Sequence, residues 1–136
     1  FCAAPQRGDA EGLIVARGEH CFVVMNLFPY NPGHVLVCPY RHVPLYLDLT
    51  DAETAEFTAM TKTALRALSA TSAPMGFNVG MNQGPVAGAG VAAHLHQHVV
   101  PRWGGDSNFL PIIGQTKALP VLLEDVRARL AATWDG

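Results

Sequence analysis

The chain has 136 residues, of which 49% are hydrophobic and 15% are charged, and its formal net charge is −2. This length is typical of one domain, and this balance excludes a disordered chain. The slight negative charge argues against a broad basic surface for nucleic-acid backbone, so no nucleic-acid partner is expected. No apolar run approaches the roughly 20 residues of a membrane-spanning helix, so no membrane partner is expected either.

The first twelve residues, 1–12, are rich in turn formers and are expected to be irregular. Strands are predicted over 13–16, 20–26 and 34–38, of which the second carries the buried-strand run CFVVM. A loop with two prolines and a glycine separates the second strand from the third, and Pro39 is expected to end the third strand.

Thr50 and Glu53 form a capping box, which predicts that a helix begins there. Apolar residues then recur at helical spacing until Pro74 and Gly76 stop the helix. Strands are predicted over 77–81 and 95–100, on either side of a glycine-rich loop over 82–93. Pro101 is expected to stop the last strand, and a C-terminal helix is predicted over 122–134. Short connections between strands favour an antiparallel sheet with helices packed on it, so the fold class is α+β in a single domain over 1–136.

The three cysteines are few, odd in number and widely spaced, which favours a reducing cytoplasm over a disulfide scaffold. No secretory signal is visible, which also predicts a cytoplasmic protein. Cys21 and Cys38 lie in apolar runs and are expected to be buried. Cys2 is a candidate structural zinc ligand, with a partner cysteine a short way upstream of Phe1, by analogy with Cys-x-x-Cys ligand pairs.

The most informative segment is HLHQHVV, which starts at His94. Successive side chains of a strand point to opposite faces, so His94, His96 and His98 are predicted to share one face. Three imidazoles on one face are a poor choice for core packing, so the row indicates a functional site.

Two chemistries use such a row: a zinc site, or a neutral imidazole that attacks phosphorus. The preceding segment NQGPVAGAGVAAH, with Gly84, Gly88 and Gly90, suits a phosphate because glycine lets backbone N–H groups approach an anion. A zinc hydrolase usually has a carboxylate near its histidines, whereas the nearest acidic residue downstream is Asp106. The pattern favours phosphate chemistry, with a metal site and structural histidines as alternatives.

At these residues the chain resembles the histidine-triad (HIT) superfamily, whose signature is three histidines alternating with mainly hydrophobic residues. Gln97 departs from that pattern at one alternating position. The segments NLFPYNPGHVLVCPYRHV, LDLTDAE and GFNVGMNQG resemble the family's nucleotide pocket, helix start and strand before the phosphate loop. The resemblance runs from about Cys21 to about Phe109. It implies a sheet-and-helix fold that forms a homodimer, with a tetramer as a further option.

The resemblance also implies a mechanism in which His96 attacks the α-phosphorus of a nucleotide and forms a nucleotidyl-histidine. His94 and His98 would orient His96 and bind phosphate oxygens. The other positions that match the family's nucleotide- or phosphate-binding positions are Asn26, His34, His42, Asn82, Gln83 and Gly84.

The tail PRWGGDSNF resembles bacterial diadenosine tetraphosphate phosphorylases, especially the actinobacterial branch, in which inorganic phosphate is the acceptor and ATP and ADP are the products. Trp103, Ala89 and Gly90 would shape the polyphosphate site there. That branch commonly carries Ser or Gln where this chain has Gly90, and a lost donor costs on the order of 1–3 kcal/mol of transition-state binding.

Several alternatives remain beside phosphorolysis. A hydrolase of dinucleoside polyphosphates or nucleoside phosphoramidates would use the same His96 intermediate with water as acceptor. A zinc hydrolase built on the triad and a non-catalytic nucleotide binder are the rivals from other classes. No tightly bound cofactor is expected, although a divalent cation such as Mg²⁺ would accompany the polyphosphate.

Overall fold

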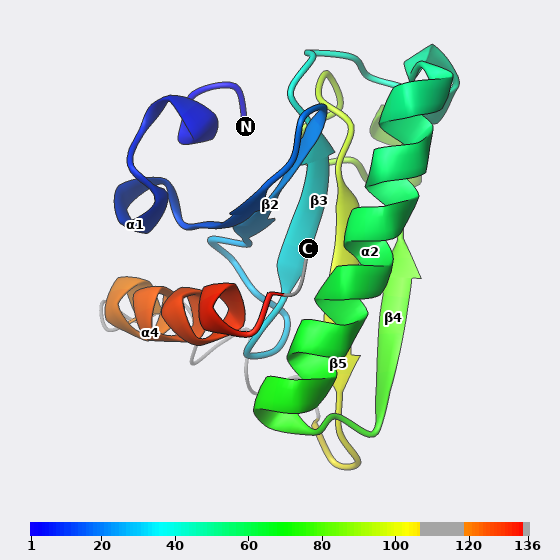
Figure 1. Cartoon of the computed structure of the whole chain (residues 1–136). Coiled ribbons are helices and arrows are strands. Elements are labelled where there is room, and N and C mark those ends of the chain that lie inside the picture. Colours follow the sequence, from blue (N-terminus) through cyan, green and yellow to red (C-terminus); the bar gives the residue numbers. More distant parts are fainter. Residues whose placement is uncertain (107–118, 135–136) are drawn as a thin grey trace.

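The computed structural model describes residues 1–106 and 119–134, with side chains placed for 1–106 and 123–134. Five strands form one sheet in the order β1-β2-β3-β5-β4, and every neighbouring pair is antiparallel (Figure 1). The strands are β1 (Ile14–Arg17), β2 (Cys21–Met25), β3 (Val35–Pro39), β4 (Gly76–Gly80) and β5 (Gln97–Arg102). This arrangement confirms the α+β prediction with about five antiparallel strands.

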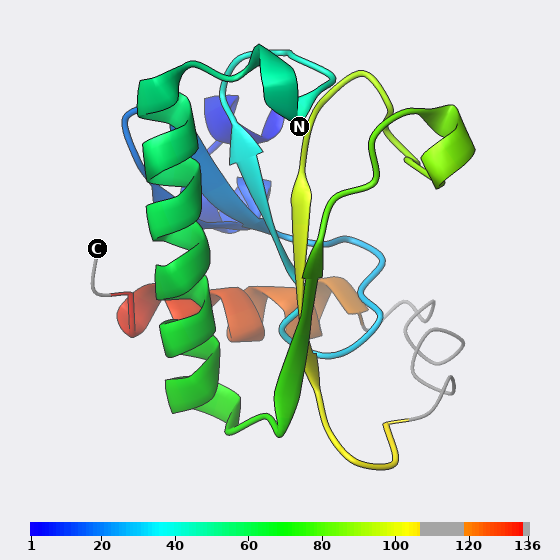
Figure 2. The same cartoon turned by 90° about the vertical axis from the view of Figure 1, so that its right-hand side faces the viewer.

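Helices α2 (Asp51–Ser72) and α4 (Leu119–Ala132) pack on one face of the sheet. Figure 2 shows that α2 (green) and α4 (orange to red) run roughly perpendicular to each other. The main core lies between this face and the helices, around Met25, Val37, Phe57, Leu68 and Leu130. The opposite face carries a smaller apolar cluster around Phe22 and Leu36, and Phe1 and Ala4 of the N-terminal segment pack against it.

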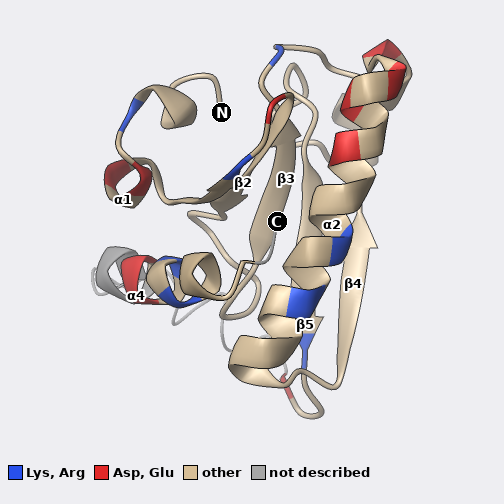
Figure 3. Cartoon of the chain, viewed as in Figure 1, with Lys and Arg blue, Asp and Glu red and all other residues tan. Residues whose placement is uncertain are grey.

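The capping box at the start of α2 forms as predicted, since Thr50 accepts from the backbone N–H of Glu53 and the Glu53 carboxylate accepts from that of Thr50. Asp51 and Glu53 lie in the first turn of α2, where a negative charge is stabilised by the helix dipole, whereas the basic residues lie in the middle of the helix (Figure 3) and none lies in its last turn. Ala73, in the left-handed conformation, caps the C-terminal end just before Pro74.

Two local predictions were wrong. Residues 1–12 are not irregular throughout, because they form the short helices η1 (Ala4–Gln6) and α1 (Asp9–Gly12). Pro101 does not stop its strand, because β5 continues to Arg102 and Pro101 lies opposite Phe77 of β4. Pro101 is tolerated because the pairing with β3 reaches only to Val99, and the Asn31 amide donates to the Pro101 carbonyl instead.

The short helices η2 (Tyr46–Asp48) and η3 (Pro85–Ala87) lie in the loops that precede α2 and β5. In the part of the chain that the structure describes, no helix is both long and apolar enough to cross a membrane.

Candidate active site

The histidine row lies on the open face of the sheet, opposite α2. Gln97 shows the orientation of β5, because its side chain points to the helix side and donates to Thr61 Oγ1 of α2 at 2.7 Å. His98 therefore points to the open face, opposite Leu36 of β3 and Gly80 of β4. The His96 ring packs at 5.0 Å from the His98 ring, which confirms that these two side chains are adjacent.

His94 shares the face of His96 but lies outside strand β5. Strand β5 begins at Gln97 rather than at Leu95, so His94 and His96 lie on the approach to the strand. The His94 ring turns toward Cys2 and His42 rather than toward His98. The predicted alternation still holds, because Leu95 packs in the helix-side core and Gln97 bonds to α2, whereas the Phe1 ring on the open face contacts both the His94 and the His96 rings.

One hydrogen bond defines the state of His96. Its Nδ1 lies 2.9 Å from the His94 carbonyl oxygen, and a carbonyl oxygen only accepts. Nδ1 therefore carries the proton, and Nε2 carries the lone pair of the neutral ring. The His96 residue is 5% exposed and lines the larger cavity of the open face. A buried imidazole with a lone pair facing a cavity is poised as a nucleophile.

A second hydrogen-bond chain defines the state of His98. The backbone N–H of Tyr30 donates to Nδ1 of His34 at 3.1 Å, so the proton of the neutral His34 ring is on Nε2. That Nε2 lies 2.9 Å from Nδ1 of His98, which must accept. The remaining His98 nitrogen, Nε2, therefore carries an N–H on the cavity side, where it can donate to a phosphate oxygen.

His34, His98 and His94 are held neutral by their surroundings. Burial, and then the nearby His98 and His96 rings, lower the pKa of His34 to about 3. Burial, and then His96, lower the pKa of His98. Burial likewise lowers the pKa of His94, although its hydrogen bond to the Pro39 carbonyl opposes the shift. Neutral rings keep the donor and acceptor roles assigned above at neutral pH.

The larger cavity of the open face has a volume of about 600 Å³ and reaches His96 and His98. It lies over β2 and β3, where Val24 and Leu36 form an apolar floor. Asn26 lies at its rim and is fixed there, because its side-chain oxygen accepts from the backbone N–H of Phe28 at 2.9 Å. Asn82 and Gly90 of the glycine-rich loop also line it. An apolar floor with amides at the rim suits a nucleoside with its phosphate at the histidines.

Sequence reasoning missed one wall of this cavity. The N-terminal segment contributes Phe1, Ala3, Ala4, Arg7 and Glu11, and the Phe1 ring packs 4.8 Å from the His96 ring. No local motif marks this role, because the segment carries neither a periodic pattern nor a recognisable site sequence.

Several predicted binding residues lie elsewhere among the described residues. The Gln83 side chain accepts from the backbone N–H of Tyr46, and Gly84 and Ala89 hold the turn around η3. Trp103 begins the turn after β5, where its backbone N–H donates to Asp106. These four residues do not line the larger cavity. The last three residues of the tail, Ser107 to Phe109, lie outside the described residues.

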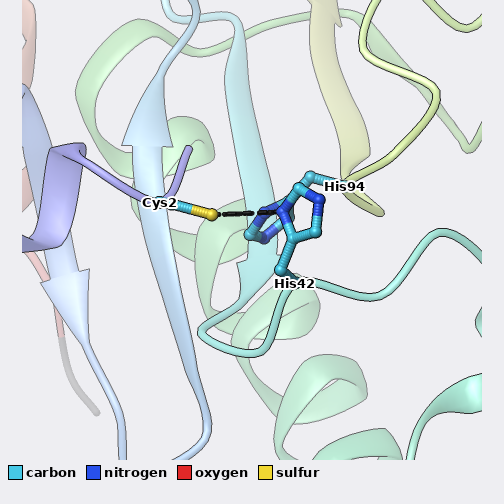
Figure 4. A group of neighbouring side chains, drawn as sticks. All are labelled: Cys2, His42 and His94. Carbon is cyan, nitrogen blue, oxygen red and sulfur yellow. Dashed lines mark hydrogen bonds between the residues drawn. The ribbon is translucent and has the colours of Figure 1, made fainter.

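His42 is also not among the cavity-lining residues, because it joins Cys2 and His94 in a separate cluster (Figure 4). The distances are 3.2 Å between Cys2 Sγ and His42 Nδ1, 3.4 Å between Cys2 Sγ and His94 Nδ1, and 3.2 Å between the two Nδ1 atoms. His94 Nε2 donates to the Pro39 carbonyl at 2.9 Å, so its Nδ1 lone pair points into the cluster. Three metal-binding atoms thus converge on one point.

This donor set fits zinc. Bond lengths of about 2.0 Å to nitrogen and 2.3 Å to sulfur in a tetrahedron place neighbouring ligand atoms roughly 3.3–3.6 Å apart, close to the distances in the cluster. The backbone hydrogen bond on the far nitrogen of His94 is the usual support for a ligating imidazole. The cluster provides three ligand positions and leaves a fourth to be supplied from outside it.

Comparisons with known proteins agree with this geometry. Residues 7–105 match the family model described as HIT domain. The chain is 55% identical over 134 residues to AP-4-A phosphorylase of Mycobacterium tuberculosis strain H37Rv. The aligned region covers 98% of this chain and 69% of that protein.

Solved structures are similar as well. A zinc-bound histidine triad family protein from Mycobacterium smegmatis is 26% identical with a TM-score of 0.74, over 97% of this chain and 92% of that one. A hypothetical histidine triad nucleotide-binding protein from Sulfolobus tokodaii is 27% identical with a TM-score of 0.77, over 96% and 90% of the two chains.

Proposed function

Because this chain belongs to the HIT domain family, we propose that it is a nucleotidyltransferase that phosphorolyses diadenosine tetraphosphate to ATP and ADP. The structural observation that carries the proposal is the hydrogen bond from His96 Nδ1 to the His94 carbonyl. This bond leaves the Nε2 lone pair facing the larger cavity of the open face, called the nucleotide cavity from here on. The 55% identity to AP-4-A phosphorylase supports the substrate and the acceptor.

In the first step, His96 Nε2 attacks the α-phosphorus, a P–N bond forms and the bond from that phosphorus to the bridging oxygen breaks, so ATP leaves. The His96 ring becomes cationic, and the His94 carbonyl stabilises it through the retained Nδ1–H. The Nε2–H of His98 donates to a phosphate oxygen as charge develops. In the second step, an oxygen of inorganic phosphate attacks the same phosphorus, the P–N bond breaks, and ADP and neutral His96 are released.

The glycine-rich loop and Asn26 would hold the rest of the nucleotide. Asn82 and Gly90 line the cavity beside His96 and His98, where amide and backbone N–H groups suit phosphate oxygens. A divalent cation such as Mg²⁺ would accompany the polyphosphate, bound mainly by phosphate oxygens.

The decisive experiment incubates the protein with diadenosine tetraphosphate, with and without inorganic phosphate, and separates the products by chromatography. Phosphorolysis yields ATP and ADP only when phosphate is present. ATP and AMP in both arms would instead identify a hydrolase with water as acceptor. His96→Ala should be inactive in both arms, and an active variant would disprove the role of His96.

We also propose that Cys2, His42 and His94 bind a structural Zn²⁺. Bound there, the ion would fix the N-terminal segment, which forms one wall of the nucleotide cavity, to the loop before β5. The cluster residues do not line that cavity, which favours a structural role over a zinc hydrolase. Purified protein should contain one zinc per chain and melt at a lower temperature after chelation. Cys2→Ser should lose the zinc, whereas Cys21→Ser, at a buried thiol outside the cluster, should keep it.

We infer in addition that the chain forms a homodimer in the cytoplasm. Strand β4 is an edge of the sheet, and the neighbouring apolar side chains of Met75 and Val79 are 80% and 46% exposed, which supports an interface along this edge. All three cysteines are free, as a reducing compartment would keep them. Sedimentation equilibrium separates monomer, dimer and tetramer directly.

A further inference from the structure

A second cavity, of about 430 Å³, lies on the same open face of the sheet. Its floor is formed by facing residues of two paired strands, with His98, Val100 and Arg102 on β5 and Asn78 and Gly80 on β4. The nucleotide cavity lies over β2 and β3, so His96 and His98 lie between the two cavities.

The two cavities share three lining residues, which are Tyr30, Asn82 and His98. The Tyr30 ring stacks on the His34 ring at 5.1 Å and is tilted against His98, so it separates the cavities without closing the route past His98. Tyr30 is 59% exposed, which leaves aromatic surface free for a ligand. A phosphate chain that starts at His96 can therefore pass His98 and Asn82 into the second cavity.

The charge in the second cavity is balanced. Arg102 donates to both carboxylate oxygens of Asp106, at 2.7 and 2.9 Å, and to the Asn78 side-chain oxygen at 2.7 Å. The Asn31 amide donates to the same carboxylate at 2.7 Å. The hydrogen bond from Arg102, then that from the Trp103 backbone, and to a smaller extent that from Asn31, keep the pKa of Asp106 below its usual range. A neutralised cation is a poor phosphate site but a suitable wall for an uncharged base and ribose, which need amides and aromatic surface.

We propose that this second cavity binds the distal nucleoside of the dinucleotide, the one that leaves as part of ATP. The proposal rests on the proposed phosphorolysis and adds to it a subsite for the leaving half of the substrate. It places the base against Tyr30 and the ribose near Asn78 and Arg102. The subsite would favour dinucleotides over mononucleoside polyphosphates that carry the same bond to be broken.

The test compares diadenosine tetraphosphate with adenosine 5′-tetraphosphate, which has the same α-phosphate and the same phosphate number but no distal nucleoside. Attack by His96 on either substrate gives the same intermediate, and phosphate then releases ADP from both. The wild type should show a kcat/KM about tenfold or more higher for the dinucleotide, the size of one lost base–aromatic contact.

Asn78→Trp fills the second cavity from an exposed strand position, where an aromatic residue suits the strand. It should lower kcat/KM for the dinucleotide to the level of adenosine tetraphosphate and leave the latter unchanged. Asn78→Ala is the matched control, since it removes the same hydrogen bond to Arg102 without filling the cavity, and it should keep most of the preference. If melting shows that Asn78→Trp is poorly folded, the smaller Asn78→Leu replaces it.

Equal rates on both substrates in the wild type, or an equal loss on both in the filled variant, would overturn the distal subsite. A raised KM for inorganic phosphate with both substrates would assign the cavity to the acceptor instead, and would also overturn it. Failure of the phosphorolysis itself looks different, because the wild type would then form no ADP from either substrate.

Discussion

His34 donates from Nε2 to Nδ1 of His98 over 2.9 Å, and the backbone N–H of Tyr30 sets the direction of that bond by occupying the other His34 nitrogen. The His34 side chain is fully buried and is not among the residues that line the nucleotide cavity. It therefore acts as a positioning residue that selects the tautomer of His98.

His34→Leu should remove this control while keeping the site apolar. The His98 proton could then move to Nδ1, and the phosphate would lose its donor in part of the molecules. We expect kcat for phosphorolysis to fall about 10- to 100-fold, less than the outright loss of an oxyanion donor, with KM for the dinucleotide little changed. Steady-state kinetics measures both constants.

His34→Gln is the matched control for that change. Its amide N–H can take the place of the Nε2 donor, so it should recover a large part of kcat relative to His34→Leu. Equal kcat values for the wild type and the leucine variant would show that His34 only fills space.

The fold was predictable from local patterns, since the capping box at Thr50, the buried run in β2 and the alternation around His98 are all short-range signals. The site was predictable only in part. The alternation predicted the shared face of the three histidines, but it did not predict that the His94 ring contacts Cys2 and His42. This cluster joins Cys2 to His42 and His94, which lie 40 and 92 residues further along the chain, and no local pattern can predict such a contact.

Stability should depend on pH through His34. Its pKa falls from 6.5 to about 3 on folding because the ring is buried, so the unfolded chain binds a proton that the folded chain excludes. The stability due to the neutral ring is fully present above pH 6.5 and is lost as the pH falls toward 3. Between pH 6.5 and 5 this group should remove about 1–2 kcal/mol from the free energy of unfolding.

Urea titrations at pH 7 and pH 5 measure that loss. His34→Gln lacks the titrating ring, so its free energy of unfolding should fall by about 1–2 kcal/mol less over the same interval. An identical pH dependence in both proteins would show that His34 does not resist protonation in the folded state.

Gln97 is the polar residue that departs from the alternating hydrophobic pattern, and the structure gives it a partner. Its amide donates to Thr61 Oγ1, and that hydroxyl in turn donates to the Phe57 carbonyl. Thr61→Val should cost about 1–3 kcal/mol because it leaves the buried Gln97 amide without its acceptor. In the double variant with Gln97→Leu, most of that cost should disappear, and a double-mutant cycle from chemical denaturation measures the coupling. Additive losses would show that the bond contributes nothing to folding.

Gly90 offers a test of the phosphate loop. The position lines the nucleotide cavity, a Cβ built there has no heavy atom within 4 Å, and its backbone does not require glycine. Gly90→Ser would add a hydroxyl donor at this position. One new hydrogen bond to a charged phosphate contributes about 1–3 kcal/mol, so kcat/KM for inorganic phosphate should rise at least several-fold.

Gly90→Ala adds the same backbone restriction without the donor and should leave this constant near the wild-type value. If the serine and alanine variants have the same kcat/KM for inorganic phosphate, the added hydroxyl makes no contact with the phosphate, and the loop binds it through backbone N–H groups alone.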